Sequence, residues 1–141
     1  MFNTVHFHPM IVHFPVAIIL VGFLAELAYL ITKKESLSYV SFWLLLTGAL
    51  SALAAYMTGQ FFTGEMSGTA GDVKENHELF ALITLITVMA NAFFRTYLKL
   101  SGKENLNLRW LTAGAYAVSA VAVSITGYFG GTLVYNYMMP L

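Results

Sequence analysis

The four histidines are the residues of this chain best suited to bind a cofactor. His6, His8 and His13 lie close together in the run HFHPMIVHF, and His77 follows in NHELF. Neutral imidazole is the commonest side-chain ligand of metal ions, and two histidines can bind a haem iron from its two faces. We therefore predict either a haem b with His13 and His77 as axial ligands, or a copper or zinc ion bound by these four histidines.

A repeated Thr-Gly pair is predicted to serve the same site. When Ser51–Phe62 is aligned with Ser119–Gly130, six of the twelve positions are identical. Glycines would leave room for a flat porphyrin, and threonine hydroxyls would bond its propionates or the histidines. Alternatively, small residues in these segments only allow close packing of helices. The residues predicted to surround the cofactor are Thr58, Gly59, Thr126 and Gly127.

The composition indicates a protein that lies in a lipid bilayer. Of its 141 residues, 58% are hydrophobic and 10% are charged, whereas a soluble domain is about 25% charged. A membrane span requires about 20 mostly apolar residues, and four such segments occur, joined by short polar segments. The sequence therefore predicts one all-α domain, residues 1–141, built as a four-helix integral membrane bundle. Its approximate spans are 9–31, 38–62, 74–100 and 107–137.

The lysines and arginines predict how the bundle crosses the membrane. Lys74 lies beside the middle connection, and the other six basic residues lie around the first and third connections. Cytoplasmic connections carry the excess of Lys and Arg. We therefore predict an up-and-down bundle with both termini and all four histidines on the non-cytoplasmic side, which is the periplasmic side in a bacterial inner membrane. The Thr-Gly repeat further predicts that two helical hairpins form a parallel internal repeat.

Glu26 lies well inside an apolar segment, whereas the other acidic residues lie near the ends of the segments or between them. Carboxylates inside the membrane are costly and are usually functional. The spacing turns Glu26 away from the face of His13, and we expect it to pair with Asn91 as a clamp between helices. A proton relay through Glu26 is the alternative. We expect Arg95 to be an anchor at the cytoplasmic surface.

Several functional classes are disfavoured by what the sequence lacks. The net charge is zero, which gives no electrostatic reason to expect nucleic-acid binding. The absence of cysteine excludes disulfides, thiolate metal sites and iron–sulfur ligation. The chain has no ordered catalytic triad, phosphate-binding loop or HExxH motif. We therefore do not expect a stand-alone enzyme.

Four segments distributed over nearly the whole chain carry a family resemblance. They are HPMIVHFPVAIIL, AAYMTGQF, VKENHELFALIT and GYFGGTLVYN. They resemble the bacterial membrane family called domain of unknown function 2231. The resemblance implies a four-span protein, and some members are fused to Rieske or cytochrome c domains. It therefore implies a membrane-embedded electron carrier or anchor with a b-type haem, whose Rieske or cytochrome c type partner is here a separate chain.

Three functions follow from these observations. The first is a haem b subunit that passes electrons between a membrane partner and a periplasmic acceptor. The second is a copper- or zinc-binding membrane protein that uses the same histidines. The third is a structural or assembly subunit, whose small-residue helix faces bind a partner or a second copy of the chain.

Overall fold

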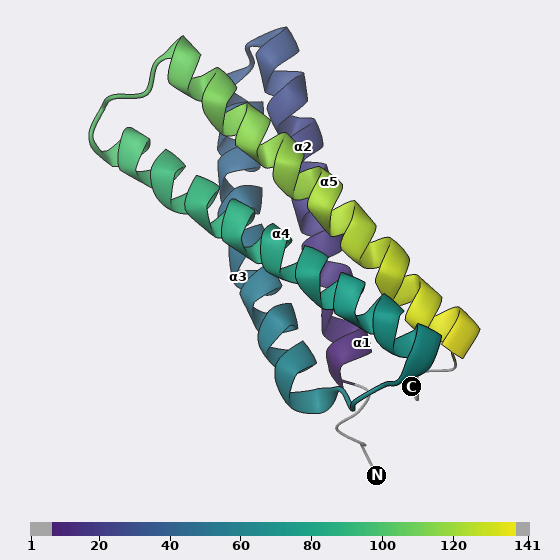
Figure 1. Cartoon of the computed structure of the whole chain (residues 1–141). Coiled ribbons are helices and arrows are strands. Elements are labelled where there is room, and N and C mark those ends of the chain that lie inside the picture. The colour runs from purple at the N-terminus through teal and green to yellow at the C-terminus, as the bar shows by residue number, and fades with distance from the viewer. Residues whose placement is uncertain (1–6, 138–141) are drawn as a thin grey trace.

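The computed structural model describes residues 7–137, and all regular secondary structure in this range is helical. The elements are α1 (Phe7–Ile11), α2 (His13–Thr32), α3 (Glu35–Phe62), α4 (Gly68–Leu100) and α5 (Leu106–Tyr137) (Figure 1). α1 and α2 together form one helical segment long and apolar enough to cross a membrane, and α3, α4 and α5 form three more. The prediction of an all-α chain with four membrane-capable helices is therefore confirmed.

Local backbone chemistry explains two of the helix boundaries. Pro15 has no N–H to donate to the carbonyl of Ile11, so the first apolar segment is interrupted at Val12 between α1 and α2. α4 begins at Gly68, before the predicted start of the third span at residue 74. Gly68 has a φ of +64°, in the left-handed region that glycine adopts without steric cost.

The helices form two hairpins that pack side by side. The most extensive packing joins α2 to α3 and α4 to α5, and further contacts join α3 to α4 and α2 to α5. Each long helix therefore has two neighbours and one diagonal partner, which is α4 for α2 and α5 for α3. Residues of α2 and α4 that face inward can thus meet only across the centre of the bundle.

Small and branched side chains fill the centre of the bundle, while large apolar side chains cover its outside. Alanine contributes several of the core positions, which lets the helices approach closely. Leu24, Leu50, Phe93 and Val121, one from each long helix, are all more than half exposed. An apolar surface on every long helix suits contact with lipid rather than with water. The core cluster comprises Ile19, Leu45, Ala49, Ala52, Val88, Ala92, Tyr116, Ala120 and Val123.

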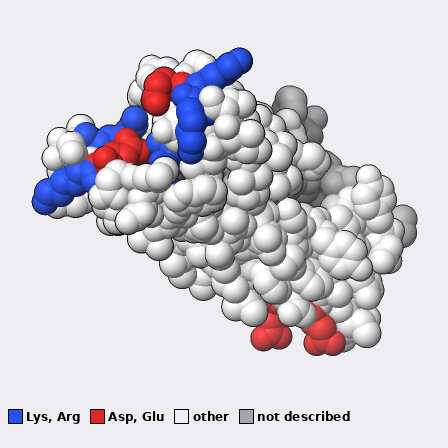
Figure 2. Space-filling model, turned by 90° about the horizontal axis from the view of Figure 1, so that it is seen from above, with Lys and Arg blue, Asp and Glu red and all other residues white. Residues whose placement is uncertain are grey.

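The two ends of the bundle differ in chemistry, and we name them for their residues. The histidine end holds α1, the α3–α4 connection and the end of α5 (Figure 1). The arginine end holds the α2–α3 and α4–α5 connections at the opposite side of the molecule (Figure 1). Figure 2 shows Lys and Arg gathered on one side of the view, with a broad uncharged surface and a few acidic atoms beyond it.

Candidate functional site

His8 of α1 and His77 of α4 lie side by side at the histidine end. Their ring centroids are 6.3 Å apart, and the angle between the ring planes is 83°. His8 is buried and His77 is partly buried. The pair therefore brings together two imidazoles from elements that are far apart in the sequence.

Each ring is fixed in place through its Nδ1 atom. His77 Nδ1 lies 3.0 Å from the carbonyl oxygen of Thr126, which can only accept, so in the neutral ring this nitrogen carries the proton. His8 Nδ1 lies 3.1 Å from Thr58 Oγ1, and that hydroxyl donates its own proton to the carbonyl of Ala55. Thr58 therefore accepts from His8 Nδ1. Both Nε2 atoms keep a lone pair, as in metal-binding histidines whose other ring N–H bonds an acceptor.

A glycine lies against each ring. A Cβ atom at Gly59 would lie 3.0 Å from His8 Cε1, and one at Gly130 would lie 3.1 Å from His77 Cε1. Gly127, which was predicted to border the cofactor, instead faces a valine of α2. Gly130 was not selected from the sequence, although it lies three residues after Gly127 and thus nearly on the same helix face. The space beside both glycines is taken up by imidazole.

His13 takes no part in the pair. It is exposed at the start of α2, and the ring beside His77 is that of His8. His13 follows His8 by five positions, which on a continuous helix would turn the two side chains about 140° apart. His6 lies outside the described residues. Within residues 7–137, no group of three or more His, Cys, Asp or Glu side chains is arranged to hold a metal ion.

A second group of polar residues is buried at the arginine end, where Glu26 binds two arginines. The side chains of Glu26 and Arg95 are 0% and 1% exposed. Arg109 Nε and Nη2 donate to the two carboxylate oxygens at 2.5 and 3.0 Å. Arg95 Nη1 lies 2.9 Å from Glu26 Oε2, and Ser41 Oγ donates to the same oxygen at 2.6 Å. This Glu26 cluster ties α2, α3, α4 and α5 together.

The two arginines of the Glu26 cluster differ in how fully they are bonded. Arg109 also donates to Ser38 at 2.9 Å and to Glu104 at 2.8 Å, and its guanidinium lies 4.2 Å from the ring centroid of Tyr29. Arg95 Nη1 forms an ion pair with Glu26 and donates to Ser41 Oγ, but its Nε and Nη2 have no partner among the described residues. All three side-chain nitrogens of Arg109 thus have a hydrogen-bond partner, whereas Nε and Nη2 of Arg95 have none among the described residues.

The predicted pairing of Glu26 with Asn91 is wrong. Asn91 Nδ2 donates instead to the carbonyl oxygen of Thr112 in α5, at 3.1 Å. The partners of Glu26 are Arg95 and Arg109, whose long side chains reach the carboxylate from α4 and α5. Arg95 was expected at the cytoplasmic surface, but it is fully buried.

Hydroxyl groups join α4 to α5 between the two ends. Ser119 Oγ donates to Thr87 Oγ1 at 3.0 Å, and the hydroxyls of Thr84 and Thr126 are 3.4 Å apart. Such contacts bind helices to each other in lipid at modest strength. The predicted site residue Thr126 therefore contacts His77 through its backbone and α4 through its hydroxyl.

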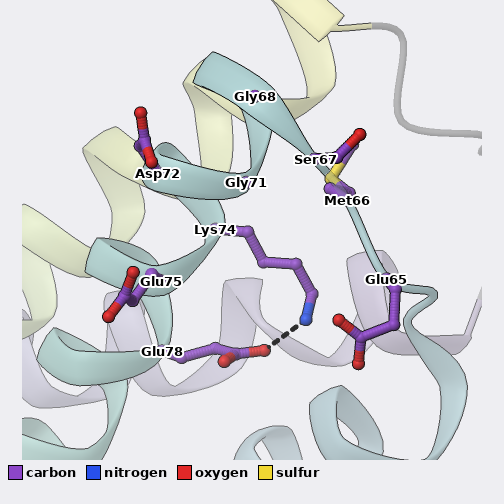
Figure 3. Close-up of a pocket in the computed structure, with 9 residues that line it drawn as sticks. All are labelled: Glu65, Met66, Ser67, Gly68, Gly71, Asp72, Lys74, Glu75 and Glu78. Carbon is purple, nitrogen blue, oxygen red and sulfur yellow. Dashed lines mark hydrogen bonds and ion pairs between the residues drawn. The ribbon is translucent and has the colours of Figure 1, made fainter.

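The α3–α4 connection forms an open hollow of about 320 Å³ with an acidic lining (Figure 3). Lys74 Nζ is 2.6 Å from Glu78 Oε1, a pair of residues one helical turn apart. Figure 3 shows Glu65 on the other side of the lysine and Asp72 and Glu75 along α4. These carboxylates do not form a metal-binding group, and none of them lies in the first turn of α4.

Comparison with known proteins identifies a family but no characterised relative. The sequence pattern of a family described as "Predicted membrane protein (DUF2231)" matches residues 4–140. No curated protein and no solved structure matches the chain. The match covers nearly all of the sequence and agrees with four helices that are long and apolar enough to cross a membrane. The resemblance noted in the sequence is confirmed, and the chain belongs to this family of membrane proteins.

Proposed function

We propose that the protein is a membrane-embedded electron-transfer subunit that binds one haem b through His8 and His77. The observation that carries the proposal is the pair of rings held through Nδ1 by Thr58 and Thr126, with both Nε2 atoms free for iron. Haem supplies reversible one-electron chemistry, and hydrogen bonds to its axial ligands tune its potential. His8 replaces the His13 ligand expected from the sequence.

The separation of the rings supports ligands on opposite sides of one ion. With metal–nitrogen bonds of about 2.0–2.1 Å, opposite imidazoles have centroids roughly 6 Å apart, whereas tetrahedral ligands have centroids roughly 5 Å apart. The observed 6.3 Å between His8 and His77 matches the first arrangement, which is how two histidines bind a haem.

The test is a visible absorption spectrum of protein purified in detergent from haem-replete cells, before and after dithionite. We expect a Soret band and sharp reduced α and β bands that disappear in His8→Ala and in His77→Ala. His13→Ala is the matched control and should retain the spectrum, because this histidine is exposed and outside the pair. A featureless spectrum of the unaltered protein would refute the proposal, and loss of the bands in His13→Ala would refute the ligand assignment.

A single copper ion is the second candidate for the same pair. The imidazoles fill the space beside Gly59 and Gly130, and an ion requires less additional room between the helices than a porphyrin does. Elemental analysis should then find stoichiometric copper that is lost in His8→Ala and retained in His13→Ala. Protein free of both haem and copper would favour the structural or assembly role.

We further infer that the bundle runs up and down across a bacterial inner membrane with its histidine end in the periplasm. Six of the seven basic residues belong to the arginine end, and an excess of Lys and Arg is typical of cytoplasmic connections. A redox partner of the Rieske or cytochrome c type would then meet the protein at the periplasmic face. The six residues are Lys33, Lys34, Arg95, Lys99, Lys103 and Arg109.

The contacts also support the internal repeat of two hairpins. Thr58 follows His8 by 50 residues, and Thr126 follows His77 by 49. Each hairpin therefore contributes one histidine and one threonine that holds it, at equivalent places. A pseudo-twofold axis along the membrane normal would relate the two halves and would place the metal between them.

A further inference from the structure

Four buried polar atoms near the arginine end have no hydrogen-bond partner among the described residues. They are Asn91 Oδ1, Arg95 Nε, Arg95 Nη2 and Tyr116 Oη. Arg95 and Tyr116 are 0% exposed and Asn91 is 3% exposed. A buried polar atom without a partner is destabilising, and more so when it is charged, so such atoms are rare in folded proteins.

The orientation of Asn91 is fixed by its neighbour in α5. Its amide nitrogen donates to the carbonyl oxygen of Thr112. A reversed amide would bring two acceptors together, so the side-chain oxygen of Asn91 must point away from Thr112 and remain free to accept. The unpartnered atoms therefore include one acceptor, the donors of Arg95, and a Tyr116 hydroxyl that can do both.

Helix geometry brings these atoms toward one region. Long side chains on a helix lean toward its N-terminus. Arg95 therefore leans toward Asn91, one turn earlier in α4, and Tyr116 leans toward Thr112, one turn earlier in α5. Because Asn91 is bonded to Thr112, all three side chains are directed toward this level of the bundle. The hydroxyl of Tyr116 also lies against Gly22, one turn before Glu26 in α2.

We propose that Asn91, Arg95 and Tyr116 form an enclosed binding site for water inside the bundle, beside the Glu26 cluster. A buried water makes about three hydrogen bonds, to both donors and acceptors, and this set of atoms offers both. An anion fits less well, because Asn91 presents an acceptor and the Glu26 carboxylate is adjacent. The charges of Arg95 and Arg109 are already balanced by Glu26 and Glu104.

Radiolytic hydroxylation tests the proposal directly, because radicals formed from a bound water label the side chain beside it. The unaltered protein in detergent is mixed with H₂¹⁸O, irradiated with a short X-ray pulse and digested for mass spectrometry. We expect Tyr116 to be labelled although it is fully buried. As the time between mixing and irradiation increases, the ¹⁸O content of the label at Tyr116 should rise more slowly than that at exposed Tyr39. Labelling of Tyr39 without labelling of Tyr116 would overturn the proposal.

Two further measurements identify the occupant. Asn91→Leu should reduce the labelling of Tyr116 several-fold, because it removes the acceptor and fills the site. Thr87→Val, one turn away in α4, is the matched control and should leave the labelling unchanged. Equal labelling in Asn91→Leu contradicts the proposal. In the second measurement, chloride replaces gluconate at constant ionic strength. If the labelling of Tyr116 falls, the occupant is an anion, and the proposal of a water site is overturned. The first measurement needs no variant, so it stands if Asn91→Leu fails to fold.

Discussion

Replacing Glu26 by glutamine should strongly destabilise the protein. The carboxylate accepts two hydrogen bonds from Arg109 and one from Ser41, forms an ion pair with Arg95, and is 0% exposed. Glutamine has nearly the same shape, so the change removes the negative charge and leaves two buried guanidinium groups facing each other. Glu104 then remains as the one carboxylate in contact with Arg109 among the described residues.

The expected size of the effect follows from burial. Removing one partner of a buried ion pair costs about 3–5 kcal/mol, because the other charge stays buried without compensation. Here the substitution leaves Arg95 without a carboxylate partner and Arg109 with Glu104 alone, so we expect a loss within that range. Glu104→Gln is the matched control. Its side chain is 29% exposed and contacts Arg109 through one oxygen, so we expect a loss of about 0–1 kcal/mol.

The assay is reversible unfolding in mixed micelles with increasing SDS, followed by circular dichroism. Arg95→Gln should be measured alone and together with Glu26→Gln, because in the double variant the charge that would lack a carboxylate partner is also removed. The double variant should therefore lose less stability than the sum of the two single variants, by about 0.5–3 kcal/mol. If Glu26→Gln changed stability by no more than Glu104→Gln does, the carboxyl group would have to be uncharged in the fold, and the ion-pair reasoning would fail.

Two other predictions concern packing and orientation. A Cβ atom at Gly22 would lie 1.8 Å from the Tyr116 hydroxyl oxygen, so Gly22→Ala should lower the free energy of unfolding by about 1–3 kcal/mol in the same assay. Gly114→Ala, where a Cβ meets nothing within 4 Å, should not be destabilising, and equal losses at the two sites would contradict the packing described. The chain has no cysteine, so Glu65→Cys should react with a membrane-impermeant maleimide in intact cells, and Lys34→Cys should react only after lysis. The opposite pattern would reverse the proposed topology.

The helices could be predicted from composition because the membrane leaves few alternatives. Every backbone group in lipid must be bonded internally, so an apolar segment of sufficient length forms a helix. The boundaries were harder to predict, because they depend on single backbone groups. Pro15 interrupts the first span. α4 begins at Gly68, earlier than the apolar pattern suggests, because polar residues extend this helix beyond the apolar segment.

The partners of the polar side chains were predicted less well, because a spacing in one helix does not reveal which residues lie opposite. Glu26 was expected to bond Asn91, whereas arginine side chains are long enough to bind it from helices that begin or end near the surface. Lys and Arg near the ends of spans predict orientation by their number alone. That rule does not distinguish an exposed Lys33 from a buried Arg95, and burial decides which of them has a structural role.

The proposed repeat contained the information needed to select the histidine that lies beside His77. The distance from His8 to Thr58 matches that from His77 to Thr126, whereas His13 lies five residues nearer to Thr58. The same relation connects the charged residues, because Glu26 and Arg95 are separated by the same number of positions as His8 and His77. If the two hairpins descend from one, a position near their common axis faces its own counterpart. Two histidines at such a position suit one shared metal, but two identical charges would repel each other. A glutamate in one hairpin and an arginine in the other remove that repulsion, so the halves had to differ at the arginine end and could stay alike at the histidine end.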